Sequence, residues 1–289
     1  MKIKFIINPV AGKGKALGIK DNILNKLINS SVSFSLTETA APGDGIRLAK
    51  KAVIEKYDII VAVGGDGTVN EVINGMVGSN AALGIIPAGT GNDFAKSLNI
   101  PADIDKALDV LLHGKEEKID IGKACGKYFM NVASIGFDAK VIEQVNTIKK
   151  YISGTWSYII AVFKTLLNYK PIKVRVSMDG MIIDKEVFLI AIANGKYYGG
   201  GMMIAPHAHV NDGYLDICII SKISKLKVAT LFPTIFKGKH IHQPEVECFK
   251  AKKVEVFAKG ASINCDGELI GKSPTTFQIE NIKLNVMVG

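Results

Sequence analysis

Short apolar runs alternate with amphipathic stretches through the first part of the chain, up to about Leu112. An apolar run of strand length followed by a helix-period stretch, repeated along the chain, is typical of a parallel sheet covered by helices. The pattern predicts strands at Lys2–Asn8, Val32–Thr37, Asp58–Val63 and Leu83–Ile86. It predicts helices at Ala16–Asn29, Gly45–Lys56, Thr68–Met76, Asp93–Leu98 and Asp103–Leu112.

From about Ile119 the pattern changes to alternating apolar and polar residues, interrupted by Asp-Gly dipeptides. Alternation with a period of two predicts half-buried strands, and an Asp-Gly pair between two such runs predicts a tight hairpin. Such hairpins are expected at Asp179–Gly180 and at Asp266–Gly267. Two helix-like stretches, Ile148–Asn168 and Leu226–Phe236, interrupt the pattern. This half is therefore expected to be an antiparallel sandwich or barrel.

The chain has 289 residues, of which 48% are apolar, so it is long enough for two domains with cores of their own. We expect an α/β domain over residues 1–122, with a Rossmann-like parallel sheet and glycine-rich nucleotide loops. An all-β antiparallel sandwich is expected over residues 123–289. The last strand of the chain could return to the N-terminal domain.

The formal net charge of +9 is unevenly placed along the chain. Residues 1–125 hold 15 basic and 14 acidic side chains, whereas residues 126–289 hold 21 and 13. Of the 36 basic residues 34 are Lys, while base-edge readout favours Arg, so we expect no nucleic acid partner. The segment Lys222–Lys259 alone contains nine Lys and three Glu. An anionic membrane surface would attract such a segment, although a solvated face is the ordinary alternative.

Several classes of protein are excluded by what the sequence lacks. No apolar run approaches the ~20 residues that a membrane-spanning helix needs, and the N-terminus does not read as a signal peptide. The four cysteines form no CxxC pair, which argues against a disulfide framework or a zinc site and for a reduced, cytoplasmic protein. His207 and His209 have strand spacing but lack a third metal ligand.

Glycine-rich turns follow three of the expected strands, at Pro9–Lys15, Gly64–Thr68 and Pro87–Asn92. In an open α/β sheet, ligands bind outside the carboxyl ends of the strands, where helix N-termini offer free N–H groups to phosphate. Gly64, Gly65 and Gly67 let the main chain approach a phosphate closely. Three such turns in succession favour a nucleotide or phosphate ligand. Neither a Walker A motif nor a dinucleotide fingerprint is present.

Asp66 and Asp93 lie in two of these turns, where a carboxylate would repel phosphate. One interpretation is that each caps the helix that follows it. The other is that a magnesium ion lies between the carboxylates and the phosphates. The second interpretation changes the prediction from phosphate binding to phosphoryl transfer.

The chain resembles the bacterial diacylglycerol kinase and lipid kinase family, which includes sphingosine and ceramide kinases. The resemblance covers nearly the whole chain, and its motifs appear in the family's order. They are Asn8–Gly12, Gly64–Glu71, Pro87–Ala95, Ile119–Gly122, Asn131–Ala139, Gly199–Pro206, Asn211–Asp216 and Asp266–Glu268. There are two departures: Ala11 stands where many members have Ser, and Gly45 stands where Ala is usual.

The resemblance implies that ATP binds in a cleft between the α/β domain and the sandwich. The implied ATP-binding residues are Asn8, Pro9, Val10, Ala11, Gly12, Thr39, Gly65, Asp66, Gly67, Thr68, Val69, Asn70, Glu71 and Thr90. An acidic network of Asp66, Asp93, Asp120 and Glu268 would act with Mg²⁺, and Glu268 would accept the proton of the lipid hydroxyl, with Asp266 as the alternative base. A second magnesium site would use Asp212 and main-chain groups at His209 and Tyr214.

The expected reaction is transfer of the γ-phosphate of ATP to diacylglycerol, giving phosphatidic acid. The alternatives are a kinase of another lipid alcohol (a sphingoid base, ceramide or phosphatidylglycerol), a non-catalytic nucleotide-binding regulator, and an enzyme similar to NAD kinase. A lipid kinase would associate peripherally with the inner face of the membrane; a homodimer is left open. The stretch Tyr151–Tyr169, with Trp156 and Phe163, fits either a buried helix or one lying among lipid headgroups.

Overall fold

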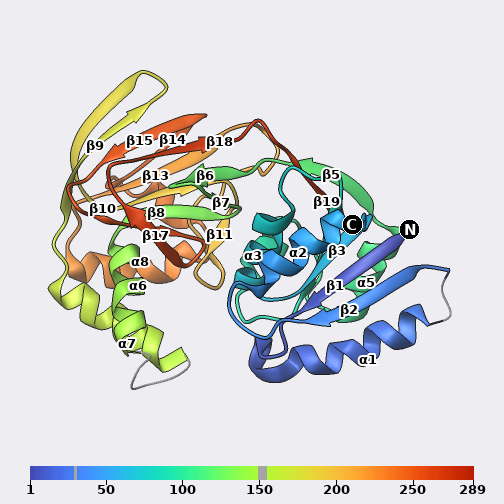
Figure 1. The fold of residues 1–289 in the computed structure, drawn as a ribbon. Coiled ribbons are helices and arrows are strands. Elements are labelled where there is room, and N and C mark those ends of the chain that lie inside the picture. The colour runs from blue at the N-terminus through green and yellow to red at the C-terminus, as the bar shows by residue number, and fades with distance from the viewer. Residues whose placement is uncertain (29–30, 149–154) are drawn as a thin grey trace. The chain divides into compact units, whose positions relative to one another are not determined.

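The computed structural model describes residues 1–28, 31–148 and 155–289 of the chain. The chain divides into two compact units, each of which is described by itself. Unit 1 consists of Met1–Ile121 together with Glu280–Gly289, and unit 2 consists of Gly122–Ile279. The end of the chain therefore belongs with its beginning (Figure 1).

Unit 1 is built on a six-stranded sheet with the strand order β2-β1-β3-β4-β19-β5. Neighbouring strands from β2 to β4 run parallel, as does β19 beside β4, whereas β5 is antiparallel to β19. The strands are β1 (Lys2–Ile7), β2 (Ser33–Glu38), β3 (Ile59–Gly64), β4 (Ala82–Pro87), β5 (Lys115–Ile119) and β19 (Leu284–Val288). The helices are α1 (Lys15–Leu27), α2 (Asp44–Ile54), α3 (Asp66–Met76), α4 (Asp93–Ser97) and α5 (Ile104–His113), with a short 3-10 helix at Ala11–Gly14.

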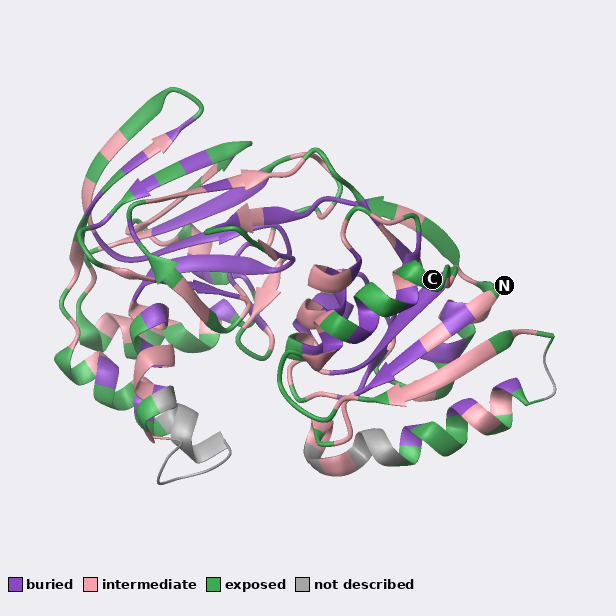
Figure 2. Cartoon of the chain, viewed as in Figure 1, coloured by how far each residue is buried: buried purple, intermediate pink, exposed green. Residues whose placement is uncertain are grey.

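Strands β3 and β4 are buried along their whole length (Figure 2). A strand that is covered on both faces can be apolar at every position, so these strands appear in the sequence as continuous apolar runs. Helices α2 and α3 pack together, and α5 contacts both β4 and β19. The expected α/β class is thereby confirmed, and the turns after β1, β3 and β4 all lie at the carboxyl edge of the sheet.

Unit 2 is an antiparallel sandwich, as expected, and its strands belong to an eleven-stranded sheet and a two-stranded one. The long strand β10 (Met181–Ala193) pairs first with β9 (Ile172–Met178) and then with β8 (Val132–Gly136) and β13 (Leu215–Ser221). The others are β6 (Gly122–Ala124), β7 (Lys127–Phe129), β11 (Tyr197–Tyr198), β12 (Met202–Met203), β14 (Val246–Ala251), β15 (Lys253–Phe257), β16 (Ser262–Cys265), β17 (Glu268–Lys272) and β18 (Thr275–Ile279). Val176, Ile190, Ile217 and Phe277 lie in its largest apolar cluster.

Both hairpins expected at Asp-Gly pairs are present, joining β9 to β10 and β16 to β17. Asp179 and Asp266 both adopt positive φ values, of 43° and 47°, and are each followed by a glycine with positive φ. Two central residues with positive φ match the right-handed twist of the flanking strands, which is why Asp-Gly marks these turns.

Unit 2 also has helices α6 (Phe137–Ile148), α7 (Thr155–Asn168) and α8 (Lys225–Ile235), and a 3-10 helix at Lys239–His242. Helix α6 was not expected, although apolar residues at Phe137, Val141 and Val145 recur four apart. The helix expected at Ile148–Asn168 is α7 from Thr155 onward; residues 149–154 lie outside the described part of the chain. Within the described residues no helix is long and apolar enough to cross a membrane.

Candidate active site

The turns after β1 and β3 meet at the carboxyl edge of the unit 1 sheet. The side-chain amide of Asn8 donates to Thr68 Oγ1 over 3.1 Å, and the main-chain N–H of Asn8 donates to the carbonyl of Val63 over 3.0 Å. A pocket of about 270 Å³ opens beside them. It is lined by Asn8, Pro9, Val10, Thr39, Ala40, Ala41, Pro42, Gly67, Thr68 and Glu71.

Seven of the residues expected to bind ATP line this pocket, namely Asn8, Pro9, Val10, Thr39, Gly67, Thr68 and Glu71. The other expected residues lie elsewhere in the same turns. Ala11 and Gly12 form the 3-10 helix, Gly65 precedes α3, and Thr90 is exposed in the turn after β4. The side chain of Val69 is buried in the core, and Asn70 accepts a hydrogen bond from Asn74.

Glycines allow the turns after β3 and β4 to touch through their main chains. A Cβ atom on Gly89 would lie 2.4 Å from the Cα atom of Gly65, and one on Gly64 would lie 2.4 Å from Thr68 Oγ1. Neither approach is possible for a residue with a side chain. The glycine pattern of the sequence therefore has a packing reason in addition to any phosphate that the turns could hold.

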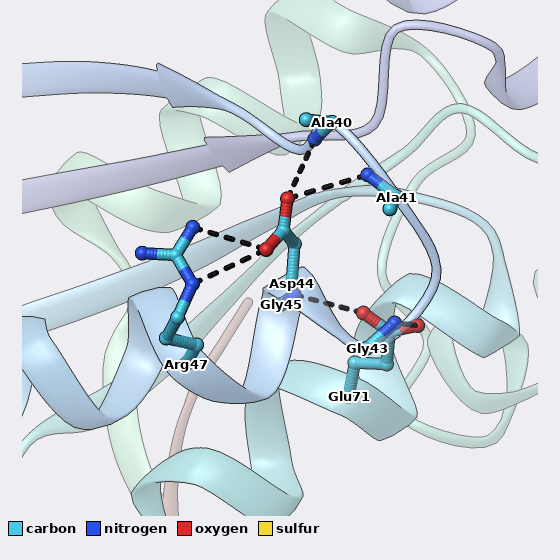
Figure 3. Close-up of polar contacts among 7 residues, drawn as sticks. All are labelled: Ala40, Ala41, Gly43, Asp44, Gly45, Arg47 and Glu71. Atoms are coloured by element: carbon cyan, nitrogen blue, oxygen red, sulfur yellow. Dashed lines mark hydrogen bonds and ion pairs between the residues drawn. The ribbon is translucent and has the colours of Figure 1, made fainter.

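Two carboxylates hold the wall of the pocket that runs from Thr39 to Pro42 (Figure 3). Asp44 accepts hydrogen bonds from the main-chain N–H groups of Ala40 and Ala41, over 2.8 and 3.2 Å, and pairs with Arg47. Glu71, on α3, accepts from the N–H groups of Gly43 and Gly45, each over 2.8 Å. Glu71 thus positions the start of α2 against α3.

The departure at Gly45 is explained by this contact. A Cβ atom at position 45 would lie 2.7 Å from both Cβ and Oε2 of Glu71. An alanine here would have to displace the glutamate side chain that accepts the N–H of the same residue. The observed position of the Glu71 side chain therefore depends on the absence of a side chain at position 45.

We expect Glu71→Ala to raise the KM for ATP about tenfold while kcat changes less than threefold. The substitution removes two charge-assisted hydrogen bonds, each contributing on the order of 1.5–3 kcal/mol. Part of that free energy would be lost from ATP binding, because the pocket wall would no longer be held in place. Steady-state kinetics at saturating lipid, with ATP titration calorimetry, would measure the effect. Glu55→Ala, at the end of α2, is the matched control. An unchanged KM and dissociation constant would contradict a positioning role for Glu71.

Asp66 and Asp93 lie close together in unit 1. Asp66 Oδ1 accepts the main-chain N–H of Phe94 over 3.0 Å. Burial raises the pKa of Asp66, the N–H of Phe94 opposes this, and the nearby charge of Asp93 adds to it. Asp93 is buried, and one of its oxygens lies 3.5 Å from the ammonium of Lys96. Neither carboxylate caps its own helix, since the N-cap residues are Gly65 and Asn92.

Asp120 follows β5 and is fully buried. It forms an ion pair with Lys283, which lies just before β19. Sequence reasoning did not single out Lys283, because the partner comes from the opposite end of the chain. The return of the chain to the unit 1 sheet is what brings this cation to Asp120.

The two carboxylates proposed as alternative bases lie in unit 2 and differ in their surroundings. Asp266 accepts three main-chain N–H groups, from Met130, Asn131 and Val132, over 2.8 to 3.0 Å. Its oxygens thus hold the chain that enters β8. Glu268, by contrast, is 58% exposed, with Lys127 3.7 Å away. Of the two, Glu268 has the carboxylate that a substrate can reach.

The expected second magnesium site has Asp212 at its centre. Asp212 Oδ1 accepts the N–H of Tyr214 over 3.0 Å, and Oδ2 binds the ammonium of Lys250 over 2.5 Å. Lys250 also lies 3.5 Å from Asp216. Lys250 therefore already forms ion pairs with both carboxylates. In the described part of the chain no group of three or more His, Cys, Asp or Glu residues could hold a metal ion, His207 and His209 included.

The Asp66–Asp93 pair fits magnesium better than the Asp212 group does. Magnesium is usually held by one or two carboxylates, with water and substrate phosphates completing its coordination. Asp66 and Asp93 lie close enough for the charge of Asp93 to contribute to the raised pKa of Asp66, so they form a pair of neighbouring carboxylates of the kind that can hold such an ion.

Asp138 is a half-buried aspartate, with one carboxylate oxygen fully buried, that sequence reasoning did not single out. It lies in the first turn of α6, where Oδ1 accepts the N–H of Ala139 over 2.8 Å. Burial raises its pKa to about 6, against the opposing hydrogen bonds of Ser134 and Asn264. Oδ2 is buried without a hydrogen-bond partner among the described residues.

We expect Asp138 to make unit 2 less stable as pH rises. The pKa of Asp138 in the folded state, about 6, exceeds the ordinary aspartate value of 3.8, so the folded state binds the proton more tightly. Stability from this group is complete below about pH 4 and is lost as pH rises through 6, by up to about 3 kcal/mol. Urea unfolding at several pH values would measure the difference between wild type and Asp138→Asn. Parallel pH profiles for the two proteins would contradict this expectation.

Family models of known proteins match both units of the chain. The sequence model described as the diacylglycerol kinase catalytic domain matches residues 2–124, and the YegS C-terminal NAD kinase beta sandwich-like domain matches residues 131–288. A diacylglycerol kinase of Staphylococcus aureus (strain bovine RF122 / ET3-1) is 34% identical over 96% of this chain and 89% of its own length. The chain belongs to the diacylglycerol kinase family.

Further relatives support membership of the same family. A diacylglycerol kinase of Staphylococcus saprophyticus is 32% identical over 99% of this chain and 94% of its own. A crystal structure of a candidate diacylglycerol kinase from Bacillus anthracis str. Sterne superposes with a TM-score of 0.82 at 26% identity, covering 100% of this chain and 97% of the other. The matches extend over both units, so the resemblance to the family and the assignment as a kinase are confirmed.

Proposed function

We propose that this family member transfers the γ-phosphate of ATP to the hydroxyl of diacylglycerol, giving phosphatidic acid, in a magnesium-dependent reaction. The observation that carries the proposal is the pocket beside Thr68 and Glu71, together with the neighbouring carboxylates of Asp66, at the start of α3, and Asp93, at the start of α4. A pocket of this kind suits a nucleotide, and the carboxylates suit the ion that accompanies its phosphates.

In the proposed reaction the lipid hydroxyl oxygen forms a bond to the γ-phosphorus while the bond to the β,γ-bridging oxygen breaks, and ADP leaves. Glu268 accepts the hydroxyl proton. Asn8, Thr39 and Thr68 hold the nucleotide in the pocket, and the turn around Gly65 offers main-chain N–H groups. Bound magnesium would neutralise phosphate charge, with Asp66 and Asp93 as its protein ligands. Asp120 forms an ion pair with Lys283.

Phosphoryl transfer proceeds through a loose transition state, so positioning and neutralisation of charge supply most of the rate. Asp66 and Asp93 are therefore as important to the proposed reaction as the base, Glu268. The second magnesium site at Asp212, with main-chain groups of His209 and Tyr214, stays a prediction. There an incoming ion would compete with Lys250.

The experiment that tests the proposal combines radiolabelled ATP and Mg²⁺ with mixed micelles of a diglyceride, sphingosine, ceramide or phosphatidylglycerol. We expect label in the diglyceride. Label in another lipid only would move the assignment to that acceptor. If no lipid is labelled although ATP still binds, the protein is a non-catalytic nucleotide-binding regulator. Label in NAD added to the same assay would instead indicate a different substrate class.

The proposed acceptor lies in a bilayer, so the enzyme would act at the inner face of the membrane as a peripheral protein. The basic excess of the second half of the chain supports this, because anionic lipid attracts lysine near the surface.

A further inference from the structure

Two of the four cysteines lie opposite each other on neighbouring strands of unit 2. Strands β13 and β14 are antiparallel neighbours (Figure 1), and their register places Cys218 directly across from Cys248. Both are free thiols. The strands keep one register from Leu215 to Ile220, so the alignment of the two cysteines is not a local irregularity. Two residues that are far apart in the sequence thus form a cross-strand pair.

The hydrogen bonds of the ladder place this pair where side chains approach closely. In an antiparallel ladder, opposite residues alternate between pairs that exchange main-chain hydrogen bonds and pairs that do not. The N–H of Ser221 donates to the carbonyl oxygen of Glu245 over 2.8 Å, and these residues continue the same register. The alternation therefore makes Cys218 and Cys248 a non-hydrogen-bonded pair. In such a pair the Cα atoms lie about 4.5 Å apart, within the range of about 4.4–6.8 Å that a disulfide spans.

The two thiols differ in their exposure. Cys218 is buried, whereas Cys248 is exposed on β14, which among the described residues pairs with β13 alone. Cys218 Sγ lies 3.9 Å from Nε2 of the buried His240, which belongs to the 3-10 helix Lys239–His242. Cys218 also packs in the apolar cluster that contains Ile235 of α8. A small solute can therefore reach the sulfur of Cys248, while α8 and the 3-10 helix shield Cys218.

The contact between the thiols gives the two sulfurs different reactivity. The hydrogen bond with Cys218 lowers the pKa of Cys248, although partial burial and the charge of Asp216 oppose this. The same hydrogen bond, together with burial, raises the pKa of Cys218. The thiolate is the nucleophilic form of cysteine. Cys248 is therefore the reactive sulfur, and Cys218 keeps its proton.

We propose that Cys248 and Cys218 form a hydroperoxide-reactive dithiol, in which Cys248 is oxidised first and Cys218 then closes a disulfide. The Cys248 thiolate attacks one oxygen of hydrogen peroxide: the S–O bond forms, the O–O bond breaks, and the leaving hydroxide takes up a proton. The Cys218 sulfur then attacks the sulfenic acid: the S–S bond forms, the S–O bond breaks, and water leaves with the Cys218 proton. The two thiols are oxidised to a disulfide and the peroxide is reduced to water.

The disulfide would close a loop of the chain. Helix α8 and the 3-10 helix Lys239–His242 both lie between Cys218 and Cys248 in the sequence. A cross-link restricts the unfolded conformations of the loop that it closes. Oxidation is therefore expected to make this part of unit 2 harder to unfold.

The test is treatment of the purified full chain with about one equivalent of hydrogen peroxide, followed by thiol titration in denaturant and peptide mapping without reductant. We expect the free thiols to fall from four to two, with a cross-linked peptide pair that contains Cys218 and Cys248. Cys218→Ser should accumulate a sulfenic acid at Cys248 that dimedone traps. Cys248→Ser, at an exposed site, should slow the loss of the Cys218 thiol about tenfold or more. It tests the proposal even if Cys218→Ser does not fold.

Cys125→Ser is the matched control, because Cys125 is the other exposed cysteine. This variant should form the same disulfide at the wild-type rate. A disulfide between Cys125 and Cys265, or between two molecules, would overturn the proposal. So would loss of the Cys218 thiol at the wild-type rate in Cys248→Ser, or four free thiols after treatment.

Limited proteolysis gives an independent measurement. A cut between residues 219 and 247 of the oxidised protein should leave the two fragments joined until reductant is added. Fragments that separate without reductant would contradict the disulfide. Neither experiment uses ATP or lipid, so its outcome does not depend on the proposed kinase reaction.

Discussion

Glu268→Gln is expected to lower kcat roughly 100-fold or more while the dissociation constant for ATP changes less than twofold. The substitution keeps the size of the side chain but removes its ability to accept a proton, and a positioned base contributes on the order of 10²–10⁴ to a rate. Because Glu268 is exposed and its ion pair with Lys127 is long, at 3.7 Å, its replacement is expected to leave the fold undisturbed. Single-turnover assays with saturating ATP and a diglyceride in micelles would measure the effect.

Glu255→Gln is the control for this experiment, since Glu255 is a similarly exposed glutamate that pairs with Lys253 in β15. It is expected to keep wild-type kcat. Wild-type turnover in Glu268→Gln would remove the assigned base. The reaction would then depend on positioning and charge neutralisation alone, which the loose transition state of phosphoryl transfer permits.

The parts of the fold that the sequence predicted are those in which local pattern and tertiary environment agree. Strands β3 and β4 are apolar throughout and buried throughout, and the Asp-Gly pairs at 179 and 266 form the expected hairpins. Element ends differ by one or two residues, as for α2, expected from Gly45 and found from Asp44. Helix α6 was missed because its apolar residues, such as Phe137, directly follow a buried strand and continue its apolar run.

The candidate site was predictable only where each of its residues lies in a short local motif. The pocket residues Asn8, Gly67, Thr68 and Glu71 were expected from short motifs, and they meet because parallel strands end at the same edge of the sheet. Partners from distant segments were not predictable. Lys283 reaches Asp120 only through β19. The carboxylate of Asp44 fixes the pocket wall by accepting the main-chain N–H groups of Ala40 and Ala41, although no motif distinguished it from the other acids of the sequence.

In both Asp-Gly turns the aspartate also binds main-chain groups outside the turn. Asp179 accepts the main-chain N–H groups of Lys252 and Lys253, over 2.9 and 3.3 Å. Asp266 accepts three, all within 3.0 Å. Sequence alone could not distinguish these two turns, because the groups that they bind come from strands that are remote in the chain.

Asp266→Ala is therefore expected to destabilise unit 2 by about 3–5 kcal/mol. This is a larger effect than the one expected for Asp179→Ala. Three N–H groups lose a charged acceptor, at on the order of 1–3 kcal/mol each, with partial compensation by water. The matched control is Asp179→Ala, because Asp179 has nearly the same positive φ and thus the same backbone cost for alanine. Its loss should be smaller by about 2 kcal/mol. Urea unfolding followed by circular dichroism would measure both.

Asp266→Asn distinguishes this structural role from a catalytic one. An amide oxygen still accepts from Asn131 and Val132, whose N–H groups share Asp266 Oδ1, whereas Met130 would face an amide nitrogen in place of Oδ2. We expect an intermediate loss of stability with kcat within threefold of wild type below the unfolding transition. A folded Asp266→Asn protein with kcat reduced as far as that of Glu268→Gln would instead make Asp266 the base, despite the three N–H groups that it holds.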